Sequence, residues 1–351
     1  MDDSSPSPRA TPASTAHRLG LALLAALLAG CTGAATAIPA APSSSATLVP
    51  AITATSSASP SPSPSAASYP IQLTDDQGAA VTIPALPRHI VSLTPATTET
   101  LFALGVGARV IGRTDFDDYP PEAKKVTPVA SYTSVNVEKI VGLGADLVLA
   151  GGNHFNDPAA IAKLRGLGIP VLVLYAPDVG TVLRDIDLVG DAVGEATRAR
   201  AMTDTMRTEI AHIIQATGSL DRPRVFYELD ATKDIYGPAD SSFLAEMLAY
   251  AGADPITTGS TTVFSIPLEK LVAADPQIIL LADAAFGTTP AQVRARPGWG
   301  GMTAVKTGAI RPIDDTTVSR PGPRLAQGLR LLALAVHPDL VLPPPAPTPT
   351  P

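Results

Sequence analysis

Cysteine, tryptophan, histidine and net positive charge are all scarce in this chain, and each scarcity excludes a class of protein. The 351 residues include one cysteine, one tryptophan and five histidines, and the formal net charge is −7. A single cysteine excludes an internal disulfide framework and a cysteine-rich zinc site. The histidines are scattered without metal-ligand spacing, and no basic run offsets the acidic balance. We therefore expect no resident metal or cofactor and no nucleic-acid partner.

Long apolar runs are also missing, and a run of eleven apolar or small residues lies near the N-terminus. Residues 19–29, directly after Arg18, are apolar or small, which is too short for a mature membrane span but suits the core of a secretory signal. The run ends in Leu28-Ala29-Gly30-Cys31, which resembles the lipobox of bacterial lipoprotein signals. This resemblance implies that residues 1–31 are a signal, that Cys31 is lipidated, and that the protein is extracytoplasmic and membrane-anchored. The alternative is a buried thiol in an apolar helix.

Proline is abundant, but it crowds the two ends of the chain. Residues 32–70 are dominated by Ala, Ser, Thr and Pro, and residues 338–351 end in a Pro/Thr run. Such compositions do not bury a core, so we interpret 32–70 as a disordered tether and 338–351 as a disordered tail. The folded region is then 71–337.

Within that region, short apolar runs alternate with short amphipathic helices. This order predicts an α/β fold in which two lobes, each a mostly parallel sheet flanked by helices, enclose a ligand cleft. The expected parts are an N-terminal lobe (71–178), connecting helices (179–217) and a C-terminal lobe (218–337). The long helix 195–217 carries an apolar stripe at helical spacing: Ala199, Met202, Met206, Ile210, Ile213 and Ile214. We interpret it as the strut that joins the lobes.

An internal echo supports matching lobes. Val137-Glu-Lys-Ile-Val141 precedes an apolar run at 146–150, and Leu268-Glu-Lys-Leu-Val272 precedes one at 277–281. Each copy predicts a helix that leads into a buried strand, although chance similarity between two such units is the alternative.

The loops after the predicted strands carry the candidate ligand-binding residues, because ligands of parallel sheets bind beyond the carboxyl ends of the strands. The aromatic side chains would stack on a flat macrocycle or pack within their own lobe. Arg320 would pair with an anionic group of the ligand or form a surface salt bridge, and His154 would ligate iron or cobalt or remain solvated. Asp115, Asp117 and Asp118 would cap the turn before Pro120 and Pro121, and acid–base carboxylates are the less favoured alternative. The predicted set is Phe116, Asp117, Tyr132, His154, Phe155, Tyr236, Phe264, Phe286 and Arg320.

Four stretches together resemble the substrate-binding lipoproteins of ABC importers for cobalamin, ferric siderophores and haem. They are residues 87–99, 112–121, 136–141 and 320–324. The resemblance covers nearly all of 71–337 and is greatest to the cobalamin-binding branch. One departure is that cobalamin binders commonly line the cleft with several tryptophans, whereas this chain has only Trp299.

The resemblance implies a monomeric solute-binding protein with a single rigid connecting helix. It would capture a cobalamin or another metal chelate and deliver it to an ABC permease and its ATPase. One exposed glutamate per lobe, Glu138 and Glu269, would dock on the permease. Ferric siderophores and haem are the alternative ligands. A surface enzyme and a ligand-sensing receptor domain are the alternative classes, but the sequence shows no nucleophile elbow, phosphate-binding loop or kinase signature, so we expect no enzyme.

Overall fold

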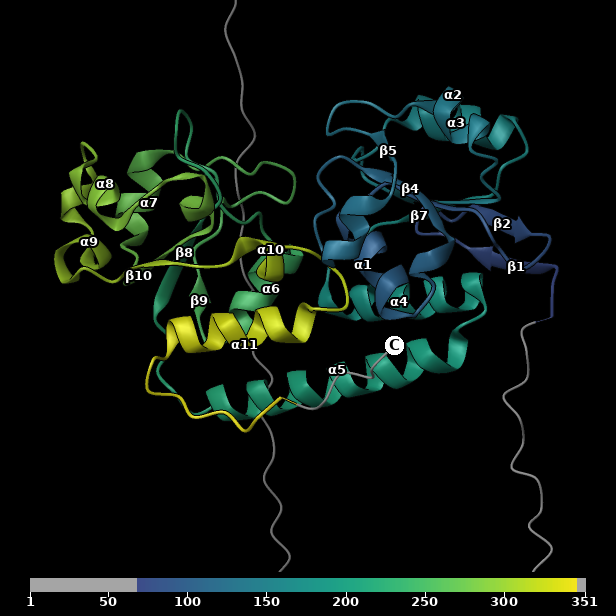
Figure 1. Ribbon diagram of the computed structural model, residues 1–351. Helices are drawn as coiled ribbons and strands as arrows, with labels where there is room; N and C mark the ends of the chain where they lie inside the picture. The colour runs from purple at the N-terminus through teal and green to yellow at the C-terminus, as the bar shows by residue number, and fades with distance from the viewer. Residues whose placement is uncertain (1–67, 346–351) are drawn as a thin grey trace, which may run out of the picture. The chain divides into compact units, whose positions relative to one another are not determined.

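The computed structural model describes residues 68–345 (Figure 1). The predicted signal, Cys31, the tether up to residue 67 and the last six residues lie outside this range.

The N-terminal lobe is built on a five-stranded parallel sheet with strand order β5-β4-β3-β6-β7. Its strands are β3 (Ile90–Ser92), β4 (Val110–Thr114), β5 (Pro128–Ala130), β6 (Leu147–Gly151) and β7 (Val171–Leu174). An antiparallel hairpin of β1 (Ile71–Thr74) and β2 (Ala80–Ile83) precedes this sheet. The lobe's α-helices are α1 (Pro95–Ala103), α2 (Val137–Gly142) and α3 (Pro158–Gly166), and η2 (Pro121–Lys125) is a 3-10 turn.

The C-terminal lobe has a four-stranded parallel sheet with strand order β11-β10-β8-β9. Its strands are β8 (Arg224–Glu228), β9 (Asp254–Pro255), β10 (Ile278–Leu281) and β11 (Ile310–Pro312). The α-helices are α6 (Phe243–Tyr250), α7 (Leu268–Ala274), α8 (Pro290–Ala295), α9 (Thr303–Thr307), α10 (Asp315–Val318) and α11 (Leu325–Val336), and a 3-10 helix, η3 (Ala282–Phe286), follows β10. The two parallel sheets confirm the predicted fold class.

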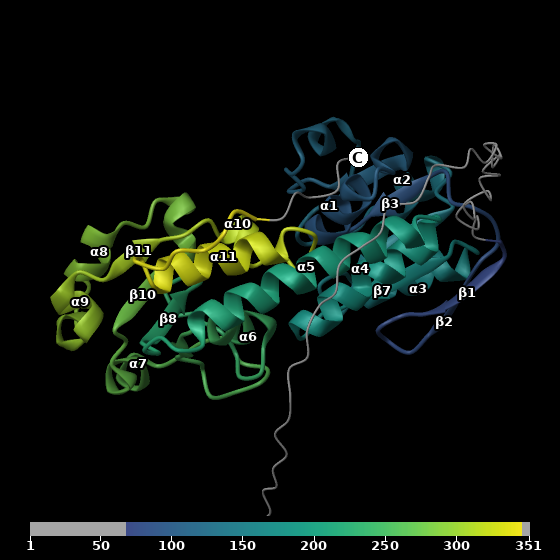
Figure 2. The same cartoon turned by 90° about the horizontal axis from the view of Figure 1, so that it is seen from below.

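Two antiparallel helices connect the sheets. Helix α4 (Val179–Val193) ends at Gly194, whose φ of 80° is left-handed, and α5 (Ala196–Thr217) follows at once. Helix α5 packs against α4 and α11, as Figures 1 and 2 show. The predicted strut is therefore confirmed, except that Ile214 is 38 % exposed and lies off the buried stripe.

The alternation of side chains along the strands divides the core. Leu147 and Leu149 of β6 face α4 and α5, whereas Val148 and Ala150 face α2 and α3. In the C-terminal lobe, Leu280 of β10 shares the first of these clusters with α5 and α11. One apolar core thus continues from lobe to lobe through α5, and this core holds the loops at the strand ends in position.

Several element boundaries differ from the predictions. Helix α1 begins at Pro95 rather than at residue 97, because Thr94 caps it by accepting the Thr97 N–H at 3.2 Å and proline suits the first helical turn. Strands β5 and β9 were not predicted, since two or three residues are too short for a periodic signal. Both copies of the internal echo, α2–β6 and α7–β10, are a helix leading into a parallel strand, as predicted.

Candidate functional site

Three aromatic rings meet beyond the carboxyl ends of the N-terminal sheet. Phe116 follows β4, Tyr132 follows β5 and Phe155 follows β6. Each ring packs edge to face on the other two, with centroid separations of 6.1, 6.4 and 6.5 Å. Tyr132 is 80 % exposed and Phe155 is 45 % exposed. Their mutual packing fixes the rings and leaves a wide apolar surface uncovered, which suits stacking on a flat ligand.

Beside this aromatic cluster lies a cavity of about 490 Å³. It is bounded by the N-terminal end of α1, the loop after β6, the end of β7, one face of α4 and the loop 319–321 of the C-terminal lobe. The lining therefore comes from both lobes. Of the predicted residues, Phe116, His154, Phe155 and Arg320 line the cavity, whereas Tyr132 lies beside it in the aromatic cluster. A volume of this size is within the usual range for small-molecule sites.

The loop after β6 is held in an uncommon backbone conformation. Asn153 and His154 have φ values of 50° and 61°, in the left-handed region that non-glycine residues rarely adopt. The buried Asn156 side chain fastens the loop, because it accepts the Gly151 N–H at 2.6 Å and donates to the Leu93 carbonyl at 3.2 Å. Strain held by surrounding contacts is typical of binding loops. The conformation of this loop leaves the His154 side chain exposed on the cavity wall.

Asp117, which was predicted to bind the ligand, does not line the cavity and is buried beneath the loop surface. It is 1 % exposed, and its carboxylate accepts hydrogen bonds from the Thr98 hydroxyl and from the backbone and hydroxyl of Thr114. Burial raises the pKa of Asp117, and these hydrogen bonds oppose that shift. Asp117 thus shapes the loop that carries Phe116, which agrees with the alternative interpretation of residues 115–118 as turn-capping.

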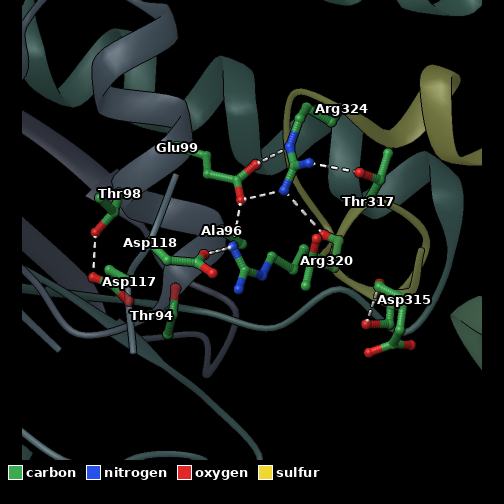
Figure 3. A network of polar contacts seen from close by, with 12 residues as sticks. Thr94, Ala96, Thr98, Glu99, Asp117, Asp118, Asp315, Thr317, Arg320 and Arg324 are labelled. Atoms are coloured by element: carbon green, nitrogen blue, oxygen red, sulfur yellow. Dashed lines mark hydrogen bonds and ion pairs between the residues drawn. The ribbon is translucent and has the colours of Figure 1, made fainter. Parts of the chain in front are cut away.

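The two lobes are joined by an ionic cluster at the cavity edge (Figure 3). Arg320 donates hydrogen bonds to Glu99 at 2.9 Å and to Asp118 at 2.7 Å. Arg324 donates to both carboxylate oxygens of Glu99, at 2.7 and 2.8 Å. Glu99, on α1, is almost fully buried. Burial alone would lower the pKa of Arg320, but the hydrogen bonds to Glu99 and Asp118 raise it. Arg320 is therefore a fixed cation whose charge is already balanced by carboxylates.

Asp185 of α4 is the cavity's carboxylate. It is 8 % exposed, next to Ile186 in the lining. Burial raises its pKa to about 8, and the nearby carboxylate of Asp76 adds to the shift, although Arg184 opposes it. At neutral pH this side chain is therefore largely uncharged. Its location in the cavity was not foreseen, because nothing in the periodicity of α4 distinguishes it from a surface aspartate.

The predicted aromatic residues of the C-terminal lobe do not line the cavity. Tyr236, Phe264 and Phe286 are 37, 46 and 90 % exposed. Trp299 is 3 % exposed and packs in the core of that lobe, with the Arg296 guanidinium 4.6 Å from its ring centroid. Trp299 thus has no surface to offer a ligand in the cleft.

The glutamates of the internal echo are both exposed in the first turn of a helix. Glu138 lies in α2, where Asn136 caps the helix, and Glu269 lies in α7. Lys163 donates to Glu138 at 2.6 Å and lowers its pKa. Among residues 68–345 no cluster of three or more metal-ligating side chains occurs, and no helix is long and apolar enough to cross a membrane.

The sequence matches a known family over most of the described region. The model of the periplasmic binding protein family matches residues 90–317. The chain belongs to this family. It is 33 % identical over 246 residues to an uncharacterized ABC transporter substrate-binding lipoprotein of Bacillus subtilis, YvrC, covering 69 % of this chain and 77 % of the relative.

Two further relatives of this periplasmic binding protein are informative. A cobalamin-binding protein of Halobacterium salinarum is 30 % identical over 250 residues, covering 68 % of this chain and 66 % of the relative. The structure of a periplasmic heme-binding protein from Pseudomonas aeruginosa superposes with a TM-score of 0.63 at 25 % identity, covering 75 % of this chain and 96 % of the other. The family consists of solute-binding proteins rather than enzymes, and this chain is a substrate-binding protein of the ABC transporter type.

Proposed function

We propose that this protein captures a cobalamin or a related corrinoid outside the cytoplasm and delivers it to an ABC permease with its ATPase. The observation that carries the proposal is the cluster of Phe116, Tyr132 and Phe155 beside a two-lobed cavity. Such a surface fits the flat face of a macrocycle. The sequence similarity to a cobalamin-binding protein supports the same ligand class.

The charges around the cavity favour a corrinoid over more anionic chelates. The lining holds one arginine, Arg320, and its charge is balanced by Glu99 and Asp118. Haem carries two carboxylates, and burying them without cationic partners is unfavourable. Corrinoids instead carry amide side arms, which can bond to polar groups such as Thr94, Asn153 and the uncharged Asp185.

Haem is the second candidate, and one observation favours it. His154 is exposed on the cavity wall, where a neutral imidazole could bind the iron of a macrocycle stacked on the aromatic cluster. A ferric siderophore is the third candidate of the same importer family. Its catecholate or hydroxamate oxygens would need cationic partners, which the paired Arg320 does not readily provide.

The deciding experiment is the visible spectrum of the purified protein after mixing with cobalamin, haem or a ferric siderophore and then desalting. Retention of the corrin bands alone supports the proposal. Retention of a haem band that is lost in His154→Ala would establish the second candidate instead. Retention of none of the three would remove metal chelates as the ligand class.

We also propose that Cys31 is the lipid anchor. The Cys31→Ser variant should leave the membrane fraction, because it lacks the thiol that receives the lipid, while its lobes unfold at the wild-type temperature. Fractionation after a salt wash measures the first and thermal unfolding the second. Continued tight membrane association of the variant would contradict the anchor.

A further inference from the structure

A second hollow, of about 1100 Å³, lies where α1, η2, α5 and α11 meet. It shares no lining residue with the ligand cavity. Figure 2 shows α5 and α11 side by side, and residues of both helices line the groove. Apolar side chains form much of its wall: Phe102 from α1, Met202 and Met206 from α5, and Leu331 and Leu334 from α11. Both lobes thus contribute to one apolar groove.

Most of the charged side chains of the groove are paired with one another, and the exposed Glu122 is the exception. Glu99 pairs with Arg324, and Glu209 with Arg330, so four of its ionic groups already have partners. The Arg324 guanidinium also lies 4.2 Å from the centroid of the Tyr119 ring, which is 45 % exposed. A groove whose charged groups are mostly paired and which carries an exposed aromatic ring favours an uncharged occupant.

A segment with these properties follows α11 and begins at the groove. After α11 the chain turns, and Leu340 and Leu342 pack against the core that contains α5 and α11. Pro345, the last described residue, lines the groove. The sequence from Pro343 onward, Pro-Pro-Pro-Ala-Pro-Thr-Pro-Thr-Pro, contains no charged residue.

We propose that the groove binds the chain's own proline-rich segment 343–351 in the polyproline II conformation. Proline-rich strands dock in aromatic-lined grooves because their conformation is already fixed and little entropy is lost. Proline lacks an N–H, so the segment mainly needs donors for its carbonyls, and the Tyr119 hydroxyl and Gln327 amide at the groove can supply them.

The lengths agree with this assignment. Six residues beyond Pro345 span about 19 Å as polyproline II at 3.1 Å per residue. The groove follows α11 from Ala326 to Leu334, roughly 12 Å at 1.5 Å per residue. The segment therefore reaches across the groove and contacts the N-terminal lobe through Tyr119 while it remains attached to the C-terminal lobe.

Cross-linking tests this contact in the full chain. Thr205 on α5 lines the groove, whereas Ala211 is exposed on the same helix outside it. In a Cys31→Ser background, Thr348→Cys is combined with Thr205→Cys or, as the control, with Ala211→Cys. A short bismaleimide should join Thr348→Cys to Thr205→Cys within one chain and leave the control pair largely unlinked. Equal yields in both pairs, or a link between two chains as in docking of a second copy, would overturn the proposal.

Hydrogen exchange gives an independent measurement. Deletion of 343–351 should speed amide exchange several-fold in residues 119–125, while exchange in the core strand β6 stays as in the full chain. Unchanged exchange in 119–125 would show that the segment does not cover the groove. Both experiments omit the transported ligand, so their outcome does not depend on the proposed function.

Discussion

The aromatic cluster is the feature whose role can be tested one residue at a time. Phe116→Ala and Tyr132→Ala should each weaken ligand binding by about 1–3 kcal/mol, the scale of a buried aromatic contact. Titration of the bound ligand by its visible band measures this. Phe286→Ala is the matched control, because its exposed ring neither lines the cavity nor packs in the aromatic cluster. If the two cluster variants lost no more binding free energy than the control, the ligand would lie elsewhere.

Asp185 should give the stability of the protein a characteristic pH dependence. Its pKa is raised to about 8 from an ordinary value of 3.8, so between these values the folded state holds a proton that the unfolded chain has released. The stability that this proton contributes is fully present below pH 4 and is lost as pH rises towards 8, by at most about 1.4 kcal/mol per pH unit.

The Asp185→Asn variant should therefore show a flatter fall in unfolding free energy between pH 5 and 8, and greater stability than the wild type above pH 8. Urea unfolding at a series of pH values measures both. The exposed Asp204→Asn should follow the wild-type curve. A slope in Asp185→Asn as steep as in the wild type would show that this carboxyl does not titrate in the stated window.

At the scale of elements, the junction between α4 and α5 depends on one backbone conformation. Gly194 has φ of 80°, and a Cβ there would lie 2.8 Å from the Leu86 side chain. Gly194→Ala should destabilise the protein by about 1–2 kcal/mol, the cost of a left-handed alanine, with more if Leu86 cannot move. Gly142→Ala in α2, where a Cβ meets nothing within 4 Å, should be neutral or slightly stabilising. Urea unfolding that ranks the two variants the other way would contradict this account.

Most elements could be predicted because their signals are local. The stripe of α5 repeats every three to four residues, and Gly194 ends α4 for a steric reason that acts at one residue. The short strands β5 and β9 have no such period, and their pairing partners define them. The same limit explains Ile214, which continues the stripe in sequence but lies 38 % exposed, because the neighbouring elements do not cover it.

At the scale of the whole molecule, the two echoed glutamates bear on delivery of the ligand. We propose that Glu138 and Glu269 meet cationic side chains of the permease, one on each lobe, since both are exposed in the first turn of a helix. The Glu138→Gln, Glu269→Gln double variant should bind ligand as the wild type does but transport it more slowly, and more so at high salt, because charge pairs steer association.

Uptake by proteoliposomes with the cognate permease measures the docking role. Glu122→Gln, on an exposed turn of the N-terminal lobe, is the matched control. Wild-type uptake by the double variant would leave these carboxylates only their favourable interaction with the helix dipole, worth about 0.3–1 kcal/mol each.

Sequence alone was enough to predict the fold class, the connecting helix and the strand ends beyond which Phe116 and Phe155 lie, whereas β5, which precedes Tyr132, was not predicted. These follow from hydrophobic period, capping and the rule that loops after parallel strands share one edge. Which side chains face the cavity depends on contacts between distant parts of the chain. Glu99 and Arg320 are 221 residues apart in sequence, yet they pair and balance the charge of the site. Asp117 and Trp299 are buried, whereas Asp185 lines the cavity. Burial depends on neighbours that are distant in the sequence, so no local sequence pattern predicts it.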